Sequence, residues 1–203
     1  MTQILPSLPL RTLLVALLWP LALAADAGEF KVGAAQVDIT PANGTPMAGY
    51  YKFRAVGGIL DPIFAKAIVV EQDGARAAFV VIDLAGTTRS LVAAARKLIA
   101  EQAQIPAERV MISATHTHTG PQLPRGSMMD EITQANSPPG VQYVNALPGL
   151  IAKSVSDALA NLKPAKASAT IGKAEGISFN RRVIGKDGKC IWQPQKIDPA
   201  VER

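Results

Sequence analysis

Two apolar runs rich in β-branched residues lie close together in the chain, at positions 67–71 and 77–83. Asp73-Gly74 separates them, and this dipeptide is a strong signal for a tight turn between two strands. The pattern therefore predicts an antiparallel hairpin. We expect Phe79, Val81 and their neighbours to be the buried side chains of its second strand.

Hydrophobic spacing changes to intervals of three and four residues from 87 to 104, which predicts an amphipathic helix. Thr87 or Thr88 is a suitable N-cap, and Pro106 lies beyond the expected end. The expected core face of this helix consists of Leu91, Ala94, Ala95, Leu98, Ile99 and Gln102. A second helical pattern covers 141–162.

Alternation of apolar and polar residues returns over 109–115 and again over 165–173, and a short strand-like piece covers 32–40. Asp187-Gly188 marks a further hairpin between Val183 and Trp192. Strand, hairpin, helix, strand, helix and strand follow one another along the chain. This order predicts an α/β fold, a layered mixed sheet with packed helices.

The first 24 residues have the pattern of a secretory signal peptide. Arg11 supplies a positive charge, residues 13–23 are apolar apart from Pro20, and Ala22-Leu23-Ala24 is a small-x-small cleavage site. The run is well short of the roughly 20 residues that cross a bilayer. We therefore expect cleavage near Ala24, export to the periplasm or the extracellular space, and a mature domain over 25–203.

Composition excludes several classes of protein. Of 203 residues, 48% are hydrophobic and 18% charged, which is typical of a globular chain rather than a disordered one. Cys190 is the single cysteine, so an internal disulfide framework is excluded. The formal net charge is +5, but Lys and Arg do not cluster with aromatic residues. We therefore expect no nucleic-acid partner. No stable protein partner is implied either.

The only two histidines, His116 and His118, stand two residues apart where the strand at 109–115 is expected to end. Residues i and i+2 of a strand project from one face, so both imidazoles can converge on one point. Zinc is the first candidate metal for such a pair. A catalytic zinc, however, usually has three protein ligands and a water. The other interpretation is two polar residues that hydrogen-bond to neighbours where the strand leaves the sheet.

Residues around the histidine pair add to the interest of this region. Thr115, Thr117 and Thr119 can supply hydrogen bonds that fix the ring tautomers. The polar, Pro-rich stretch that follows, 122–140, predicts a long irregular loop. Loops of this length in compact domains are often functional.

Five short segments stand in order along the chain and carry a family resemblance. They are Val32-Gly33-Ala34-Ala35, Val37-Asp38-Ile39-Thr40-Pro41, Gly49-Tyr50, Ser113-Ala114-Thr115-His116-Thr117-His118-Thr119-Gly120-Pro121 and Asn180-Arg181. Together they resemble the N-terminal part of the neutral/alkaline (non-lysosomal) ceramidase family. The Thr-His-Thr-His-x-Gly-Pro segment is the most specific of them.

This resemblance implies a secreted zinc amidohydrolase that cleaves the N-acyl bond of ceramide to a fatty acid and sphingosine. By the same resemblance, His116 is a zinc ligand, and His118 hydrogen-bonds the carbonyl oxygen or the bound water. Arg181 matches a family arginine near the site, and Asp38 a buried acid close to it. From its sequence alone, Asp38 is better explained as a cap of the following turn, because Asp is a habitual turn former. The implied substrate is a lipid-like N-acyl amide, met at a membrane surface.

The chain also departs from the family pattern. Gln122 and Leu123 stand where family members commonly have two glycines, and Arg182 where a small residue is common. A related amide substrate therefore stays open. The family's other zinc ligands, a second histidine, a glutamate and a tyrosine, come from sequence after the point matching Arg203.

Residues 25–203 are thus expected to be the N-terminal portion of a larger catalytic domain, incomplete as a hydrolase. A non-catalytic secreted α/β domain or a truncated gene product is the alternative. A His-x-His amidohydrolase built on a barrel fits less well, because such enzymes carry the motif on their first strand.

Overall fold

A computed structural model of the protein describes residues 28–175, 177, 182–185 and 187–192. The chain divides into two units, one up to Lys166 and the other from Ala167. The predicted signal peptide, 1–24, lies outside the described residues.

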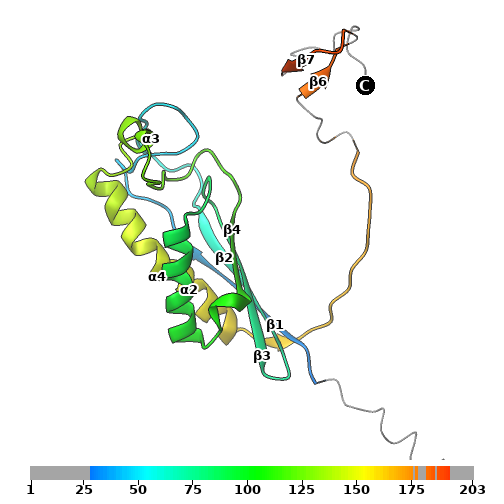
Figure 1. The fold of residues 1–203 in the computed structure, drawn as a ribbon. Coiled ribbons are helices and arrows are strands. Elements are labelled where there is room, and N and C mark those ends of the chain that lie inside the picture. Colours follow the sequence, from blue (N-terminus) through cyan, green and yellow to red (C-terminus); the bar gives the residue numbers. More distant parts are fainter. Residues whose placement is uncertain (1–27, 176, 178–181, 186, 193–203) are drawn as a thin grey trace, which may run out of the picture. The chain divides into compact units, whose positions relative to one another are not determined.

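A five-stranded mixed sheet is the centre of the first unit, with the strand order β4-β3-β2-β1-β5 (Figure 1). Neighbouring strands are antiparallel except for β3 and β4, which are parallel and joined through α2. This confirms the predicted α/β fold with a mixed sheet. The strands are β1 (Lys31–Asp38), β2 (Phe64–Gln72), β3 (Ala75–Ile82), β4 (Val110–Ala114) and β5 (Lys163–Pro164).

The hairpin between β2 and β3 turns at Asp73 and Gly74, as the sequence predicts. Both residues have positive φ, 53° and 76°. This pair of left-handed conformations is typical of the two-residue turns whose twist matches that of the flanking strands.

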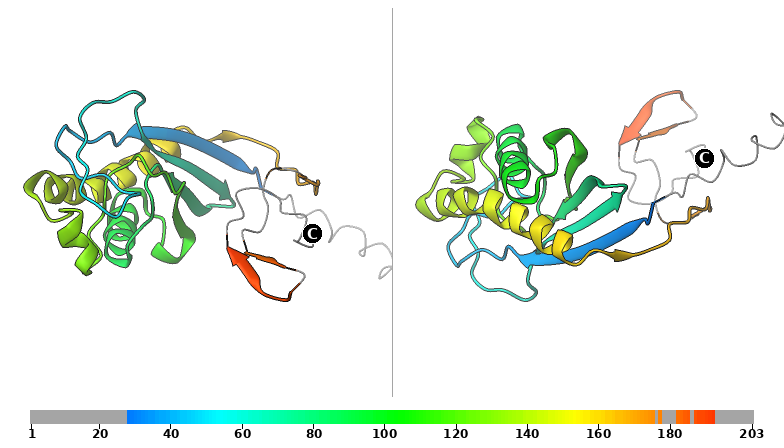
Figure 2. Two further views of the ribbon diagram at one scale, coloured as in Figure 1. Left: turned by 90° about the horizontal axis from the view of Figure 1, so that it is seen from above. Right: turned by 90° about the horizontal axis from the view of Figure 1, so that it is seen from below.

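Two helices cover one face of the sheet, α2 (Arg89–Ala103) and α4 (Pro138–Ala160) (Figure 2). Helix α2 is capped by Thr88, whose Oγ1 accepts the backbone N–H of Leu91 at 3.2 Å. Its buried residues are Leu91, Ala95, Ile99 and Ala103. The predicted helix is thus confirmed. Ala94 and Gln102 of its predicted core face are exposed, however, and Ala103 is the last core position.

Helix α4 approaches β1 so closely that only glycine fits at position 33. A Cβ on Gly33 would overlap the carbonyl oxygen of Ala158 and lie 2.9 Å from the backbone nitrogen of Leu162.

Helix α4 begins three residues before the predicted start. Prolines are well tolerated in a first helical turn, because the N–H groups there have no intrahelical partner.

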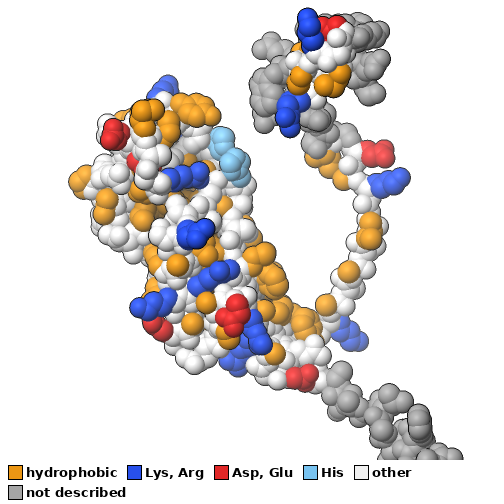
Figure 3. Space-filling view, in the orientation of Figure 1, with side chains coloured by type: hydrophobic (Ala, Val, Ile, Leu, Met, Phe, Trp, Pro, Cys, Tyr) orange, Lys and Arg blue, Asp and Glu red, His pale blue; other side chains and the backbone are white. Residues whose placement is uncertain are grey.

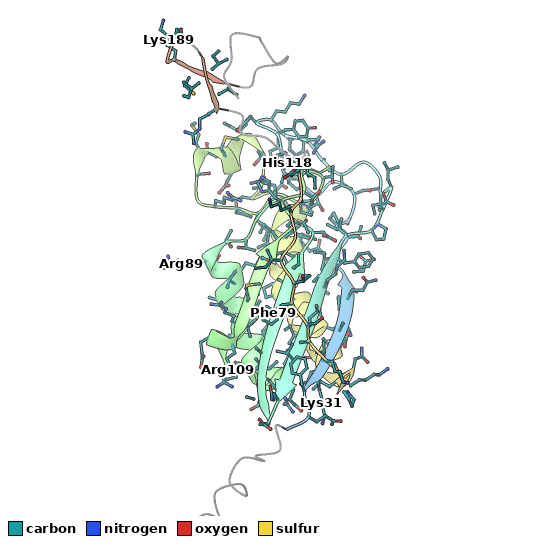
Figure 4. The ribbon with its side chains drawn as sticks, turned by 90° about the vertical axis from the view of Figure 1, so that its right-hand side faces the viewer. Lys31, Phe79, Arg89, Arg109, His118 and Lys189 are labelled. Atoms are coloured by element: carbon teal, nitrogen blue, oxygen red, sulfur yellow. The ribbon has the colours of Figure 1, made fainter. Side chains whose placement is uncertain are left out.

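The prediction for β3 chose the wrong face. Val80 and Ile82 are fully buried, whereas Phe79 and Val81 are 44% and 36% exposed. Both faces of this strand are apolar, so alternation by itself does not decide which one is covered. The helices pack on the side of Val80, and Phe79 is left on the open face (Figure 4).

Two other predictions were wrong in part. Residues 165–173 form no strand; β5 pairs with β1 only through Lys163 and Pro164. The stretch 122–140 is not wholly irregular, because it contains a short helix, α3 (Met128–Ile132), and the first turn of α4.

The predicted hairpin around Asp187-Gly188 is confirmed in the second unit. It consists of β6 (Arg182–Ile184) and β7 (Cys190–Trp192). A 3₁₀ turn, η2 (Ala107–Arg109), leads into β4 in the first unit.

Candidate functional site

His116 is anchored to the segment that follows β3. Its backbone N–H donates to the carbonyl of Leu84 at 3.0 Å, and its ring Nδ1 lies 2.7 Å from the carbonyl oxygen of Ala85. A carbonyl only accepts hydrogen bonds, so Nδ1 carries the proton in this contact. In the neutral ring, Nε2 is then left with a free lone pair, the form in which histidine binds a metal.

The ring of His118 lies next to the Nε2 lone pair of His116. The two Nε2 atoms are 3.4 Å apart, and the ring centroids are 5.0 Å apart with an interplanar angle of 67°. Both side chains are exposed (Figure 3) and lie at one end of the sheet, opposite to Lys31 and Arg109 (Figure 4). The predicted convergence of the two imidazoles is confirmed.

The backbone that produces this convergence is not the predicted one. Strand β4 ends at Ala114, so neither histidine lies in a strand. His116 has φ 64°, a left-handed conformation that is uncommon for a residue other than glycine. A sharp turn after the strand, rather than the strand's own alternation, therefore brings the rings together.

Residues 46–49 form the wall beside His118. Ala48 N–H donates to the carbonyl of Gly120 at 2.9 Å, and Gln122 N–H donates to the carbonyl of Pro46 at 2.8 Å. Gly49 packs directly on His118: a Cβ at this position would overlap the Cβ of His118 and lie 2.7 Å from its Cγ. Gly49 also has φ 96°, which favours glycine.

A cavity of about 400 Å³ opens beside the two rings. Tyr50, Tyr51 and Gln122 line it from the loops, and Arg125 and Asp130 line it from the region of α3. Two tyrosines, one basic residue and one acidic residue are therefore among the residues that line the space next to the histidines.

Asp130 organises the loop that carries Arg125. Its Oδ2 accepts the backbone N–H groups of Arg125, Gly126 and Ser127 at 2.8, 2.6 and 3.2 Å. The carboxylate is buried, and its Oδ1 has no hydrogen-bond partner within the described residues. Sequence reasoning missed Arg125 and Asp130, although Ser127-x-x-Asp130 is a capping-box pattern that marks the start of a helix.

Asp38 is exposed, whereas the family resemblance implies a buried acid. Its Oδ1 accepts the backbone N–H of Thr40 at 2.7 Å, which is the turn-capping arrangement that the sequence allowed. Hydrogen bonds from the Thr40 side chain and backbone lower the pKa of Asp38 below its ordinary value. The exposure follows from strand alternation, because Val37 and Ile39 on either side point into the core.

The remaining predicted residues are placed as follows. Arg181 lies outside the described residues. Thr117 Oγ1 and Thr119 Oγ1 are 2.9 Å apart and hydrogen-bond to each other. The tautomer of His116 is therefore set by Ala85 instead of by a threonine.

The histidine pair fits half of a zinc site. Two nitrogens bound to one tetrahedral zinc at their usual bond lengths are about 3.3 Å apart, close to the 3.4 Å between the two Nε2 atoms. The described part of the chain contains no group of three or more His, Cys, Asp or Glu side chains placed to share a metal ion. It also contains no helix long and apolar enough to cross a membrane.

Comparisons with known proteins agree on one family. Residues 30–185 match the model of the neutral/alkaline non-lysosomal ceramidase, N-terminal region. The structure is similar to the crystal structure of neutral ceramidase from Pseudomonas aeruginosa (TM-score 0.56, 27% identity), covering 68% of this chain and 23% of that one. It is also similar to a ceramidase complexed with C2 (TM-score 0.51, 29% identity), covering 68% and 22%. No protein with curated annotation matches.

Proposed function

Since the chain belongs to the neutral/alkaline non-lysosomal ceramidase family, we propose that it serves zinc-dependent hydrolysis of the amide bond of ceramide-like lipids. The products would be a fatty acid and a sphingoid base. The observation that carries this proposal is the convergence of His116 and His118, with Nε2 atoms 3.4 Å apart, at the edge of a cavity.

His116 would hold the metal through Nε2, because its Nδ1 proton is committed to the carbonyl oxygen of Ala85. When bound, zinc polarises an amide carbonyl and lowers the pKa of a bound water to about 7. His118 would donate a hydrogen bond from Nε2 to the amide carbonyl oxygen, where negative charge develops during attack. This Nε2 lies 3.4 Å from Nε2 of His116, so a donor from His118 is next to the nitrogen that would hold the metal.

The cavity fits an amphipathic amide. Tyr50 and Tyr51 offer flat apolar rings with polar tips, while Arg125 and Gln122 offer hydrogen-bond donors. Of the two residues that replace family glycines, Gln122 lines the cavity, whereas Leu123 is buried in the core. Of these two differences from the family pattern, Gln122 is thus the one that would affect which substrate binds. One solved relative is a ceramidase complexed with C2, which supports an amide lipid as the ligand class.

Turnover needs more than the described residues supply. A catalytic zinc has three protein ligands as a rule, and two histidines converge here. The chain spans less than a quarter of the length of the two ceramidases. We therefore assign metal binding to His116, with His118 beside the metal, and hydrolysis to a site that further ligands complete. A secreted domain without catalysis stays the alternative.

Metal analysis of the purified chain tests the first step. We expect the wild-type protein to retain zinc after dialysis and His116→Ala to lose it. Thr117→Ala is the matched control, because Thr117 lies between the histidines and hydrogen-bonds to Thr119. Zinc retention that is equal in the wild type and His116→Ala, or absent from both, would contradict the assignment.

A chimaera tests hydrolysis. Residues 30–185 would replace the matching region of the Pseudomonas aeruginosa neutral ceramidase, with release of a fluorescent fatty acid from an N-acylsphingosine as the readout. We expect measurable turnover that His116→Ala abolishes. A folded, zinc-loaded chimaera that releases no fatty acid would favour the non-catalytic alternative.

A further inference from the structure

Arg54 connects the two segments that hold His118. It lies in the loop between β1 and β2, and one of its terminal nitrogens donates to two backbone carbonyls. The acceptors are the oxygen of His118 at 2.8 Å and the oxygen of Ala48 at 3.1 Å. The same guanidinium therefore ties the histidine turn to the wall that carries Gly49.

The surroundings of Arg54 are unusual for a residue that only stabilises a fold. Its guanidinium lies over the ring of Tyr50, 4.1 Å from the centroid, and its Nε is buried without a hydrogen-bond partner. No carboxylate of the described residues forms an ion pair with it. A partly buried cation with an unpaired N–H contributes little net stability.

The two histidines differ in how they are anchored. The ring of His116 is fixed by the carbonyl of Ala85. In the described part of the chain, the ring of His118 has one hydrogen-bond partner, which is the ring of His116 itself. The position of His118 therefore depends on its backbone, and that backbone is fixed by Arg54 on the carbonyl and by Gly49 against Cα, Cβ and Cγ.

We propose that Arg54 is a positioning residue, which orients the His118 peptide and thereby holds the His118 ring against that of His116. The use of this ring pair for metal rests on the proposed function, but the positioning is a property of the metal-free chain. Removal of the groups that orient a metal ligand typically weakens metal binding by 10- to 100-fold. We expect Arg54→Ala to lower zinc affinity by at least about tenfold on this basis.

The test uses the two histidines as probes, because the chain contains no others. Histidine side chains labelled with ¹⁵N give two imidazole signals, and a nuclear Overhauser effect between rings 5.0 Å apart reports their proximity. In the metal-free wild type we expect this effect and a protonated Nδ1 on His116. In Arg54→Ala we expect the effect to vanish while the His116 tautomer persists.

Two variants make the test specific. Arg54→Lys should restore the Overhauser effect in part, because a single ammonium can donate to both carbonyls. Arg96→Ala is the matched control: Arg96 also donates to a backbone carbonyl, that of Val110 at 2.6 and 2.9 Å, but at a distant part of the sheet. The control should lose stability and keep both the Overhauser effect and the zinc affinity.

The outcomes separate the two proposals. An Overhauser effect that persists in Arg54→Ala would overturn the positioning role, whatever the zinc affinity. Its disappearance in Arg54→Ala, together with a wild type that binds no zinc, would uphold the positioning role and reject the proposed function. If Arg54→Ala does not fold, Arg54→Gln is judged by the same signal. Unfolding of both, with Arg96→Ala folded, would overturn the proposal, because Arg54 would then support the whole fold.

Discussion

Hydrogen bonds to backbone carbonyls hold the histidine pair in place. The oxygen of Ala85 fixes the ring of His116, and the oxygens of His118 and Ala48 share one donor from Arg54. Glycine is needed at position 49 because the His118 ring occupies the space of a side chain. Each of these requirements belongs to a single residue and can be tested there.

Gly49→Ala is expected to disrupt the pair. Its Cβ would collide with the Cβ and Cγ of His118, and its φ of 96° adds about 1–2 kcal/mol of backbone strain. We expect zinc affinity to fall at least about tenfold, as measured by titration. Gly44→Ala is the control, because it has a φ of 85° and no atom within 4 Å of the added Cβ. It should lose stability and bind zinc normally; equal zinc affinity in both variants would refute the role of Gly49.

Because of Tyr143, we expect the free energy of unfolding to fall at alkaline pH. Its hydroxyl donates to the carbonyl of Ile39 at 2.9 Å, and burial, helped by the charge of Asp38, raises its pKa above the ordinary value of 10.0. A pKa raised by folding means that the unfolded chain ionises first, so this contribution is complete below pH 10 and declines above it. Urea unfolding at pH 9, 10 and 11 should show the wild type losing about 1 kcal/mol more per pH unit above 10 than Tyr143→Phe. Parallel pH curves for the two proteins would contradict this.

Among the elements, β3 shows most clearly how the sheet is built. One face of the strand packs on α2 and α4, and the other lies in an apolar row that crosses four strands. The row consists of Ala34, Ile68, Phe79 and Met111, which are paired in register from β1 to β4. Ile68, Phe79 and Met111 are 47%, 44% and 52% exposed. Adjacent residues of this strand are therefore expected to contribute very different amounts to the free energy of unfolding.

We expect Val80→Ala to cost more stability than Phe79→Ala, although valine is the smaller of the two side chains. Val80 is fully buried among the helices, and its truncation leaves a cavity, so we expect a loss of about 2 kcal/mol. Phe79 is exposed on the open face, and we expect a loss of about 1 kcal/mol or less. Urea denaturation of both variants measures the difference. A larger loss in Phe79→Ala would mean that the open face is covered in solution.

At the scale of the whole molecule, the helices cover one face of the sheet, and the histidine site lies at one end of it (Figure 4). The matched region corresponds to less than a quarter of each of the two similar ceramidases. We infer that the chain is exported, from the signal pattern of residues 1–24.

Export is tested by expressing the full chain and sequencing the N-terminus of the protein found outside the cytoplasm. We expect it to begin at Ala25, after cleavage behind Ala22-Leu23-Ala24. Leu17→Arg should block export, because a charge in the apolar run prevents its recognition as a signal. An intact Met1 on exported protein would reject cleavage, and equal export of Leu17→Arg would reject the signal.

The sequence by itself determined the order and type of most elements, because alternation, helical spacing, caps and turn dipeptides are local. It also determined the histidine pair and the family, through the segment from Ser113 to Pro121. It did not determine which face of β3 is buried, since both faces are apolar and only helix packing distinguishes them. Arg54 was likewise not predictable, because its contact with His118 joins positions 64 residues apart in the chain. Arg125 and Asp130 follow the histidines closely in sequence, but only the folded loop brings them to the same cavity. The tertiary structure decided these features. The local sequence pattern is compatible with more than one arrangement, and only packing between distant segments selects one of them.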